Sequence, residues 1–186
     1  EVTHEVAFAG RSNAGKSSAI NAITQQKALA RTSKTPGRTQ QINVFPITED
    51  RAITDLPGYG YAKVDTATRE QWGRLLTGYF RQRRALKGVM VIMDIRHPLT
   101  SHDLAMLELT KANDLPVHVL LSKADKLSRG AALNTLQAVR RELRMLHPAA
   151  DAQLFSAVTR QGVEEAHAQL DRWLFPEAGA AESAAP

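Results

Sequence analysis

The chain has 186 residues, 43% of them hydrophobic and 23% charged, a composition typical of one globular domain with a sizeable core. It contains no cysteine, which excludes disulfides, thiol catalysis and cysteine-based zinc sites, and no apolar run approaches the roughly 20 residues that cross a bilayer. The formal net charge of +5 permits a polyanionic partner without requiring one. The first residues lack the pattern of a signal peptide, and the absence of cysteine fits the cytoplasmic protein that we expect.

The first motif along the chain is GRSNAGKSS, which lies between a short apolar run and the start of a helical pattern. Gly10, Gly15, Lys16 and Ser17 fit G-x-x-x-x-G-K-S, in which backbone N–H groups and the helix start surround an anion. Lys16 would contact the outer phosphates of a nucleotide, and the Ser17 hydroxyl would bind Mg²⁺. A chance turn is the alternative, but the flanking strand and helix patterns favour a phosphate loop. The residues expected around the phosphates are Gly10, Arg11, Ser12, Asn13, Ala14, Gly15, Lys16, Ser17 and Ser18.

A polar, basic stretch without periodicity, RTSKTPGRTQQ, follows at residues 31–41. It is either an ordinary connection or a segment that orders around Mg²⁺ and a terminal phosphate and is released after hydrolysis. Thr39 is best placed to offer a hydroxyl to the metal, with Thr35 as the alternative.

The motif DLPG follows a short apolar run. Asp55, at the end of a predicted strand, could reach Mg²⁺ through a water molecule. Gly58 would leave its backbone N–H free to approach the terminal phosphate. An ordinary strand-ending turn is the alternative, but the spacing from the phosphate loop favours a nucleotide-sensing segment.

A basic run, RQRRALK, occupies residues 81–87 at the end of a helical pattern. It is either a solvated helix end, where cations suit the helix dipole, or a contact to RNA. Three helices are expected to direct apolar side chains toward the core. Those side chains are Trp72, Leu75, Leu76, Tyr79 and Phe80; then Leu133, Leu136, Val139, Leu143 and Leu146; then Val163, Leu170, Trp173 and Leu174.

The motif LSKADKL follows another apolar strand pattern and bears on the choice of base. Lys123 and Asp125 match a guanine-reading motif, in which the carboxylate accepts from the ring N–H and the exocyclic amine; adenine lacks this pair of donors. Ser122 replaces the usual Asn or Thr, and its hydroxyl could still tether the loop. Phe155 to Ala157, after the last predicted strand, could direct backbone N–H groups to the guanine oxygen.

Apolar strand patterns alternate with helical ones, which predicts a P-loop α/β domain over residues 1–175 with a mainly parallel six-stranded sheet and helices on both faces. The second and third strands should form an antiparallel hairpin at one edge of the sheet. Residues 176–186 are small and polar, which predicts a disordered tail. The predicted strands are 6–9, 41–47, 52–56, 88–95, 116–122 and 152–156.

From about Glu5 to Leu174 the sequence resembles the EngB family of TRAFAC GTPases, also called YihA or YsxC. The motifs that carry the resemblance are GRSNAGKSS, TPGRTQ, DLPGYGYAKV and DIRHPLT. The resemblance implies GTP binding and hydrolysis, assistance to assembly of the large ribosomal subunit (rRNA and ribosomal proteins), and a link to cell division and septation. We expect a monomer. Ser17 and Thr39 match magnesium ligands. Beyond the phosphate loop, the positions matching nucleotide contacts are Gly37, Arg38, Thr39, Gln40, Gln41, Asp55, Leu56, Pro57, Gly58, Ser122, Lys123, Ala124, Asp125, Phe155, Ser156 and Ala157.

The predicted catalytic groups are Lys16, Thr39 and Gly58, which act by positioning and by neutralising charge. Tyr59 stands where Ras-like proteins place the Gln that orients water, so we expect slow intrinsic hydrolysis completed by a partner or an ion. Arg38 is a candidate arginine finger. Asn13 is either a turn former or, like an Asn of some related GTPases, a K⁺ ligand. A nucleotide-binding scaffold with negligible turnover is the alternative function.

Overall fold

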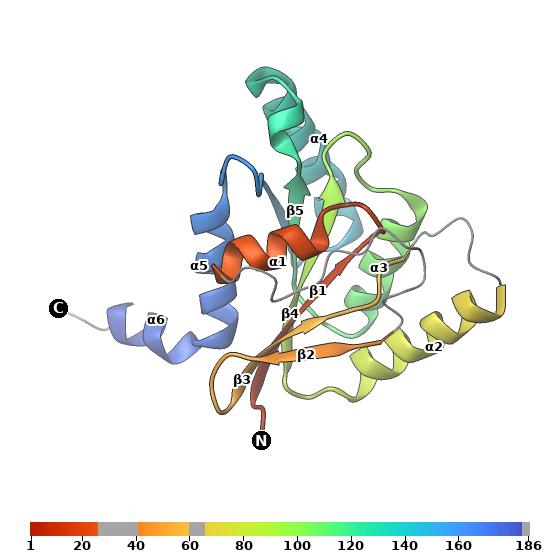
Figure 1. The fold of residues 1–186 in the computed structure, drawn as a ribbon, viewed down its shortest axis with the longest axis vertical. Coiled ribbons are helices and arrows are strands. Elements are labelled where there is room, and N and C mark those ends of the chain that lie inside the picture. Colours follow the sequence, from red (N-terminus) through yellow and green to blue (C-terminus); the bar gives the residue numbers. More distant parts are fainter. Residues whose placement is uncertain (26–40, 60–65, 184–186) are drawn as a thin grey trace.

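The structure is a computed structural model of the chain, and it describes residues 1–25, 41–59 and 66–183. Its centre is a six-stranded sheet of order β2-β3-β1-β4-β5-β6, in which β2 is antiparallel to β3 and the other neighbours are parallel (Figure 1). This confirms the predicted fold, with strand ends within about two residues of the expected ranges. The strands are β1 (His4–Gly10), β2 (Asn43–Pro46), β3 (Arg51–Asp55), β4 (Leu86–Asp94), β5 (Val117–Ser122) and β6 (Ala150–Leu154).

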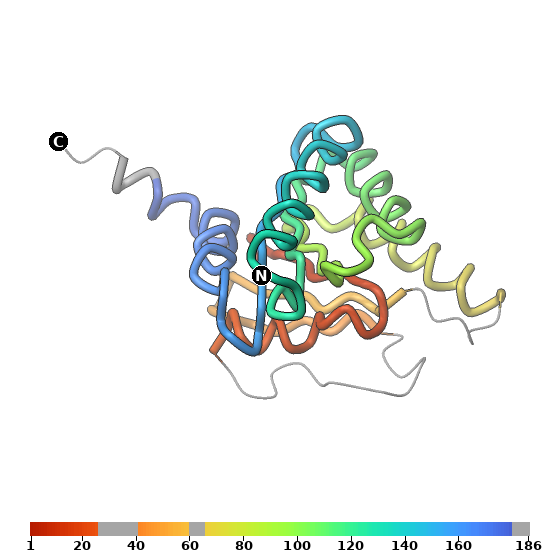
Figure 2. Tube along the Cα trace, turned by 90° about the horizontal axis from the view of Figure 1, so that it is seen from above, coloured from red at the N-terminus to blue at the C-terminus, as the bar shows by residue number. Residues whose placement is uncertain are grey.

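Helices cover both faces of the sheet, as Figure 2 shows from above. Alternate residues of β1 serve the two cores, because successive side chains of a strand point to opposite faces. Val6 and Phe8 pack with one group of helices, whereas Ala7 and Ala9 pack with the other. The first group is α1 (Lys16–Thr24) and α5 (Val163–Leu174), and the second is α2 (Thr66–Gln82), α3 (Ser101–Ala112) and α4 (Arg129–Leu146).

The carboxyl ends of the parallel strands meet at one edge of the sheet, where ligands of open α/β folds bind. β1 ends at Gly10, β3 at Asp55, β4 at Asp94 and β5 at Ser122, so the motifs that follow these strands meet there. The fold therefore gathers segments that are widely separated in sequence. None of the described helices has the length and apolarity that a membrane crossing would require.

Helix α6 (Pro176–Ser183) occupies the described part of the segment 176–186, for which the sequence predicted a disordered tail, and residues 184–186 lie outside the described residues. Its first residue is a proline, which suits the first turn of a helix, and alanine is the strongest helix former. Arg51 donates to Glu177 at 2.6 Å and to the carbonyl of Leu174 at 2.5 Å. The small residues of this segment therefore form a helix whose first turn is joined to β3.

The apolar stripes of α2 and α4 are only partly buried. Leu75 is 39% exposed and Leu133 is 42% exposed, whereas other members of the same stripes, such as Trp72 and Leu136, are buried. The 3.6-residue period predicted both helices correctly, but it predicted more buried side chains on each helix than the structure shows.

Candidate nucleotide-binding site

The loop between β1 and α1 is built from backbone. Gly15 stands at the N-cap of α1 with φ 97, a left-handed conformation that suits glycine, and Asn13 also has a positive φ of 66. Among the described residues no side chain caps α1, so the N–H groups of its first turn remain available to an anion. A Cβ on Gly10 would lie 2.9 Å from the carbonyl oxygen of Ile92, so the loop approaches β4 too closely for a side chain.

Lys16 and Asp55 form a buried ion pair at the centre of the site. The Nζ atom of Lys16 lies 2.5 Å from an Asp55 carboxylate oxygen and also donates to the backbone carbonyl of Leu56. The two side chains are only 9% and 5% exposed. The structure thus brings together the residues expected to contact the phosphates and Mg²⁺.

Ser122 and Lys123 join the end of β5 to the phosphate loop. The Ser122 hydroxyl donates to the backbone carbonyl of Ala14 and lies 3.2 Å from that of Met93. Lys123 Nζ donates to the backbone carbonyl of Asn13 at 2.7 Å. The Ser122 hydroxyl thus links the end of β5 to the phosphate loop, at the position where Asn or Thr is usual.

Asp94 is a member of the site that sequence reasoning did not single out. Partial burial alone would raise the pKa of Asp94, but hydrogen bonds from the side chain and backbone of Arg96, with the charges of Arg96 and Lys123, outweigh it and lower the pKa to about 2. Arg96 contacts both carboxylate oxygens, at 3.0 and 2.8 Å, and Lys123 Nζ lies 3.5 Å away. The sequence did offer a signal for Asp94. It is a charged residue in DIRHPLT, at the end of a predicted strand whose carboxyl end lies at the same edge of the sheet as the phosphate loop.

The predicted base-reading carboxylate of Asp125 is exposed but held in place. The Ser156 hydroxyl donates to it at 2.8 Å and in turn accepts from the backbone N–H of Thr159 at 3.1 Å. The backbone N–H of Ala124 donates to the carbonyl of Phe155 at 3.0 Å, which joins the two loops. Sequence reasoning assigned backbone donors to 155–157 and missed that the Ser156 side chain orients Asp125.

Hydrogen bonds between buried polar side chains hold the turn after β6 in place. His118 Nε2 lies 2.7 Å from the Gln153 side-chain oxygen, and Gln153 donates to the carbonyl of Gly162 at 2.8 Å. Burial lowers the pKa of His118, so a neutral ring with a proton on Nε2 satisfies the contact. These hydrogen bonds support the loop that carries Ser156.

Tyr59 points away from the phosphate loop. Its backbone continues the pairing with β1, because its N–H donates to Gly10 at 3.2 Å and its carbonyl accepts from Ser12 at 2.8 Å. Its hydroxyl donates to Asp103 of α3 at 2.7 Å, and the side chain is only 9% exposed. Burial raises the pKa of Tyr59 well above its ordinary value, and the Asp103 carboxylate adds to the rise. The phenol is therefore not directed at the place of an attacking water.

Replacing Tyr59 by Phe should destabilise the fold by about 1–3 kcal/mol, because the buried carboxylate of Asp103 loses a hydrogen-bond donor. The GTP hydrolysis that the resemblance implies should stay within about twofold of the original rate. Tyr79→Phe is the matched control, since it removes a phenol–carboxylate hydrogen bond from α2 to Glu5 of β1. Denaturant unfolding and single-turnover hydrolysis provide the two readouts, and hydrolysis slowed about tenfold only in Tyr59→Phe would assign the phenol to the reaction.

Several predicted contacts lie outside the described residues. These are Gly37, Arg38, Thr39 and Gln40, together with the alternative Thr35. Gln41 is described and exposed, two residues before Asn43, which pairs with Asp55 at the same edge of the sheet. The roles of these residues, like the other assigned nucleotide contacts, stay predictions.

Sequences of known proteins resemble this chain over most of its length. A family profile described as "50S ribosome-binding GTPase" matches residues 5–123. The "Probable GTP-binding protein EngB" of Hydrogenovibrio crunogenus is 54% identical over 171 residues, covering 92% of this chain and 81% of that protein. Its counterpart in Nitrosococcus oceani is 56% identical over 170 residues, covering 91% and 85%.

Solved structures show the same fold at low sequence identity. A crystal structure of a probable GTP-binding protein EngB has a TM-score of 0.72 at 19% identity, covering 91% of this chain and 98% of that one. Era, solved in complex with MgGDPNP and nucleotides of 16S ribosomal RNA, has a TM-score of 0.70 at 20% identity, covering 94% and 58%.

Proposed function

The chain belongs to the EngB family of GTP-binding proteins, and from this we propose that it is a slow GTP-hydrolysing switch that assists assembly of the large ribosomal subunit. In the same proposal it acts in the cytoplasm as a monomer, supports normal cell division and septation, and forms its nucleotide-binding domain from residues 1–175. The observation that carries guanine selectivity is Asp125, whose carboxylate is fixed by Ser156 on the edge where the phosphate loop lies. An oriented carboxylate accepts the paired N–H donors of guanine and is left unpaired by adenine.

The phosphates would lie against the uncapped start of α1, where backbone N–H groups and Lys16 supply positive charge. Lys16 would exchange its contact with Asp55 for the outer phosphate oxygens. The hydroxyl of Ser17 and the carboxylate of Asp55 are hard oxygen donors of the kind Mg²⁺ prefers, with Asp55 acting through water and Thr39 as a further proposed ligand. When bound, the ion would neutralise charge on the phosphates.

Slow intrinsic turnover follows from the position of Tyr59. Phosphoryl transfer needs positioned donors, here Lys16 and the backbone N–H of Gly58, and also a group that orients water. Tyr59 occupies the sequence position of that group, and its hydroxyl is committed to Asp103. A partner or a bound ion would therefore complete the site, which is what a switch reset by its target requires.

Asn13 is our candidate for such an ion site, because its side chain is exposed on the phosphate loop. GTP hydrolysis should run faster in K⁺ than in Na⁺ at equal ionic strength, since a cation near the bridging oxygens stabilises the transition state. Asn13→Ala should abolish the difference and leave GDP affinity largely intact. Its φ of 66 supports the competing role of turn former, which equal rates in the two salts would establish.

The proposal is tested by titrating purified large ribosomal subunits with the protein loaded with GDP or with a non-hydrolysable GTP analogue. A switch binds differently in the two states, because only one nucleotide holds the segment after Asp55 with a terminal phosphate. We expect at least about tenfold tighter binding in one state. Equal affinity in both states, or none in either, would overturn the ribosomal function while leaving GTP binding unaffected.

A further inference from the structure

A groove of about 490 Å³ lies beside α2 and is lined by residues of that helix together with Ile42 and Arg83. Ile42 and Leu75 give it apolar surface, and Arg74 and Gln82 are polar groups at its side. Leu75 belongs to the stripe predicted to be buried, yet it is 39% exposed. The groove is thus an amphipathic surface, and it lies on the first helix described after the nucleotide-sensing segment at Gly58.

Gly78 lines the groove, and the fold does not require a glycine there. A Cβ at this position would meet no heavy atom within 4 Å, and the same is true of Gly73, which does not line the groove. Glycine inside a helix is unfavourable relative to alanine, because it loses more conformational freedom on folding. At Gly78 the absence of a side chain makes the groove deeper. The glycine therefore serves the shape of the groove rather than the stability of the helix.

One wall of the groove is held rigid by a buried carboxylate. Glu5 of β1 is fully buried and accepts from the Tyr79 hydroxyl and from Arg83, whose terminal nitrogen lies 2.7 Å away. Tyr79 and Arg83 both line the groove. The wall is therefore preformed, which lowers the entropic cost of binding a partner. Arg83 is already paired and is not one of the cations available to that partner.

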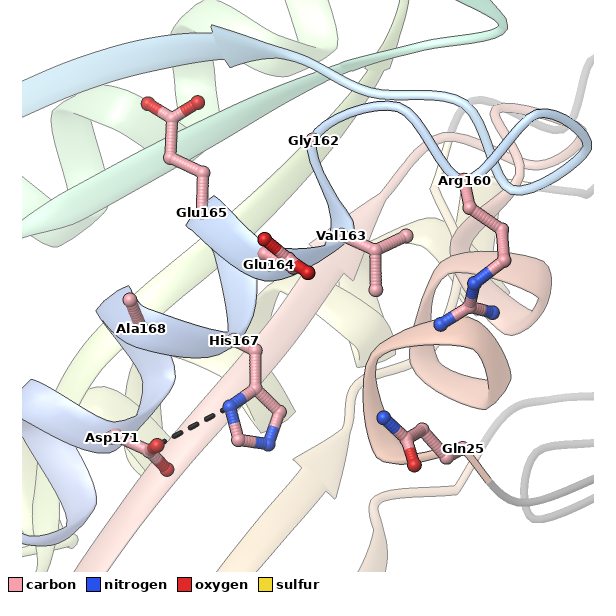
Figure 3. A pocket seen from close by; sticks show the side chains of 9 residues that line it. All are labelled: Gln25, Arg160, Gly162, Val163, Glu164, Glu165, His167, Ala168 and Asp171. Carbon is pink, nitrogen blue, oxygen red and sulfur yellow. Dashed lines mark ion pairs between the residues drawn. The ribbon is translucent and has the colours of Figure 1, made fainter.

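Three arginines, one that lines the groove and two that neighbour its lining residues in sequence, are available as cations. Arg74, Arg81 and Arg84 are exposed and form no ion pair with another residue in the described part of the chain, and Glu70 is the only acidic residue of α2. A hollow of about 640 Å³ on the other face of the sheet, between Gln25 and α5, has three carboxylates and one arginine, Arg160, in its lining (Figure 3). Those carboxylates are Glu164, Glu165 and Asp171.

We propose that the groove on α2 binds an unpaired stretch of RNA, with phosphates on Arg74, Arg81 and Arg84 and one unstacked base entering over Gly78. Arginines bind phosphates, and an apolar floor beside Tyr79 and Arg83 accepts the face of a base. The hollow on α5, with three carboxylates against one arginine, is less favourable for the same strand. The inference rests on the proposed ribosomal function, because it takes RNA as the partner.

The first test compares Gly78→Ala with Gly73→Ala, using a labelled single-stranded RNA of about 12 nucleotides. Both variants should raise Tm by about 3 °C, because alanine favours the helix. Only Gly78→Ala should weaken RNA binding, by about tenfold, because its methyl group fills the groove. Unchanged RNA affinity in Gly78→Ala, or equal weakening in both variants, would overturn the proposal.

The second test varies salt and partner. Replacing Arg74, Arg81 and Arg84 together by Ala should lower the slope of log affinity against log salt by about 2, since each single-strand phosphate contact contributes about 0.7. GDP affinity should not change. Binding of duplex RNA as tight as of the single strand would exclude base entry, and tighter binding of polyglutamate would assign the groove to an acidic protein. Both readouts use RNA alone, so they can fail while nucleotide-dependent subunit binding succeeds, and the reverse.

Discussion

Replacing Asp125 by Asn should lower the affinity for GTP by about 100-fold and create affinity for xanthine nucleotides. The carboxylate accepts two donors from guanine, whereas the Asn amide presents its own donor to the exocyclic amine. Losing one charge-assisted hydrogen bond costs about 1.5–3 kcal/mol. The repulsion between the Asn amide and the exocyclic amine brings the total loss of binding free energy to about 3 kcal/mol, which corresponds to the roughly 100-fold loss of affinity. Xanthine carries an oxygen where guanine has its amine, so it accepts from Asn. Competition of GTP, XTP and ATP against labelled GDP measures the change.

Asp151→Asn is the matched control, because Asp151 is an exposed carboxylate paired with Arg140 away from the nucleotide loops. It should leave all three affinities unchanged. Ser156→Ala should weaken GTP binding less than Asp125→Asn and in the same direction, because it frees the carboxylate without removing it. ATP and GTP competing equally against GDP in the unmodified protein would refute guanine selectivity altogether.

Replacing Lys16 by Ala should slow GTP hydrolysis by about 10²–10³-fold, since a single preorganised donor to developing charge is worth that much. It should also destabilise the nucleotide-free protein by about 3–5 kcal/mol, because the Asp55 carboxylate, only 5% exposed, loses its ion-pair partner. Single-turnover hydrolysis and denaturant unfolding measure the two effects.

The double variant Lys16→Ala, Asp55→Asn separates these effects. Removing the buried charge should recover most of the lost stability, because no uncompensated carboxylate remains. Hydrolysis should stay at least as slow as in the single variant, because Asp55 is itself a proposed contact to Mg²⁺. Hydrolysis recovering together with stability would show that Lys16 acts only by holding the fold, contrary to the role proposed for it.

Local sequence determined the elements of this protein and the order of its motifs. The strand runs, the hairpin of β2 and β3 and the start of α1 after Gly15 follow from side-chain period, from glycine conformation and from the length of the connections. Each of these signals acts within a few residues, so one sequence is enough to detect it. The parallel order then placed the motifs at one edge, because carboxyl ends of parallel strands must meet.

Only the tertiary structure decided which side chains meet across that edge. Tyr59 donates a hydrogen bond to Asp103, 44 positions away, and Ser156 donates one to Asp125, 31 positions away. No periodicity in the sequence relates the members of such pairs. The exposure of Leu75 had the same origin, since a helical period gives the direction of a side chain but not how far the neighbouring elements extend over it. Local patterns thus gave the chemical groups of the site, whereas contacts between distant segments fixed their orientation, because packing free energy depends on the whole fold.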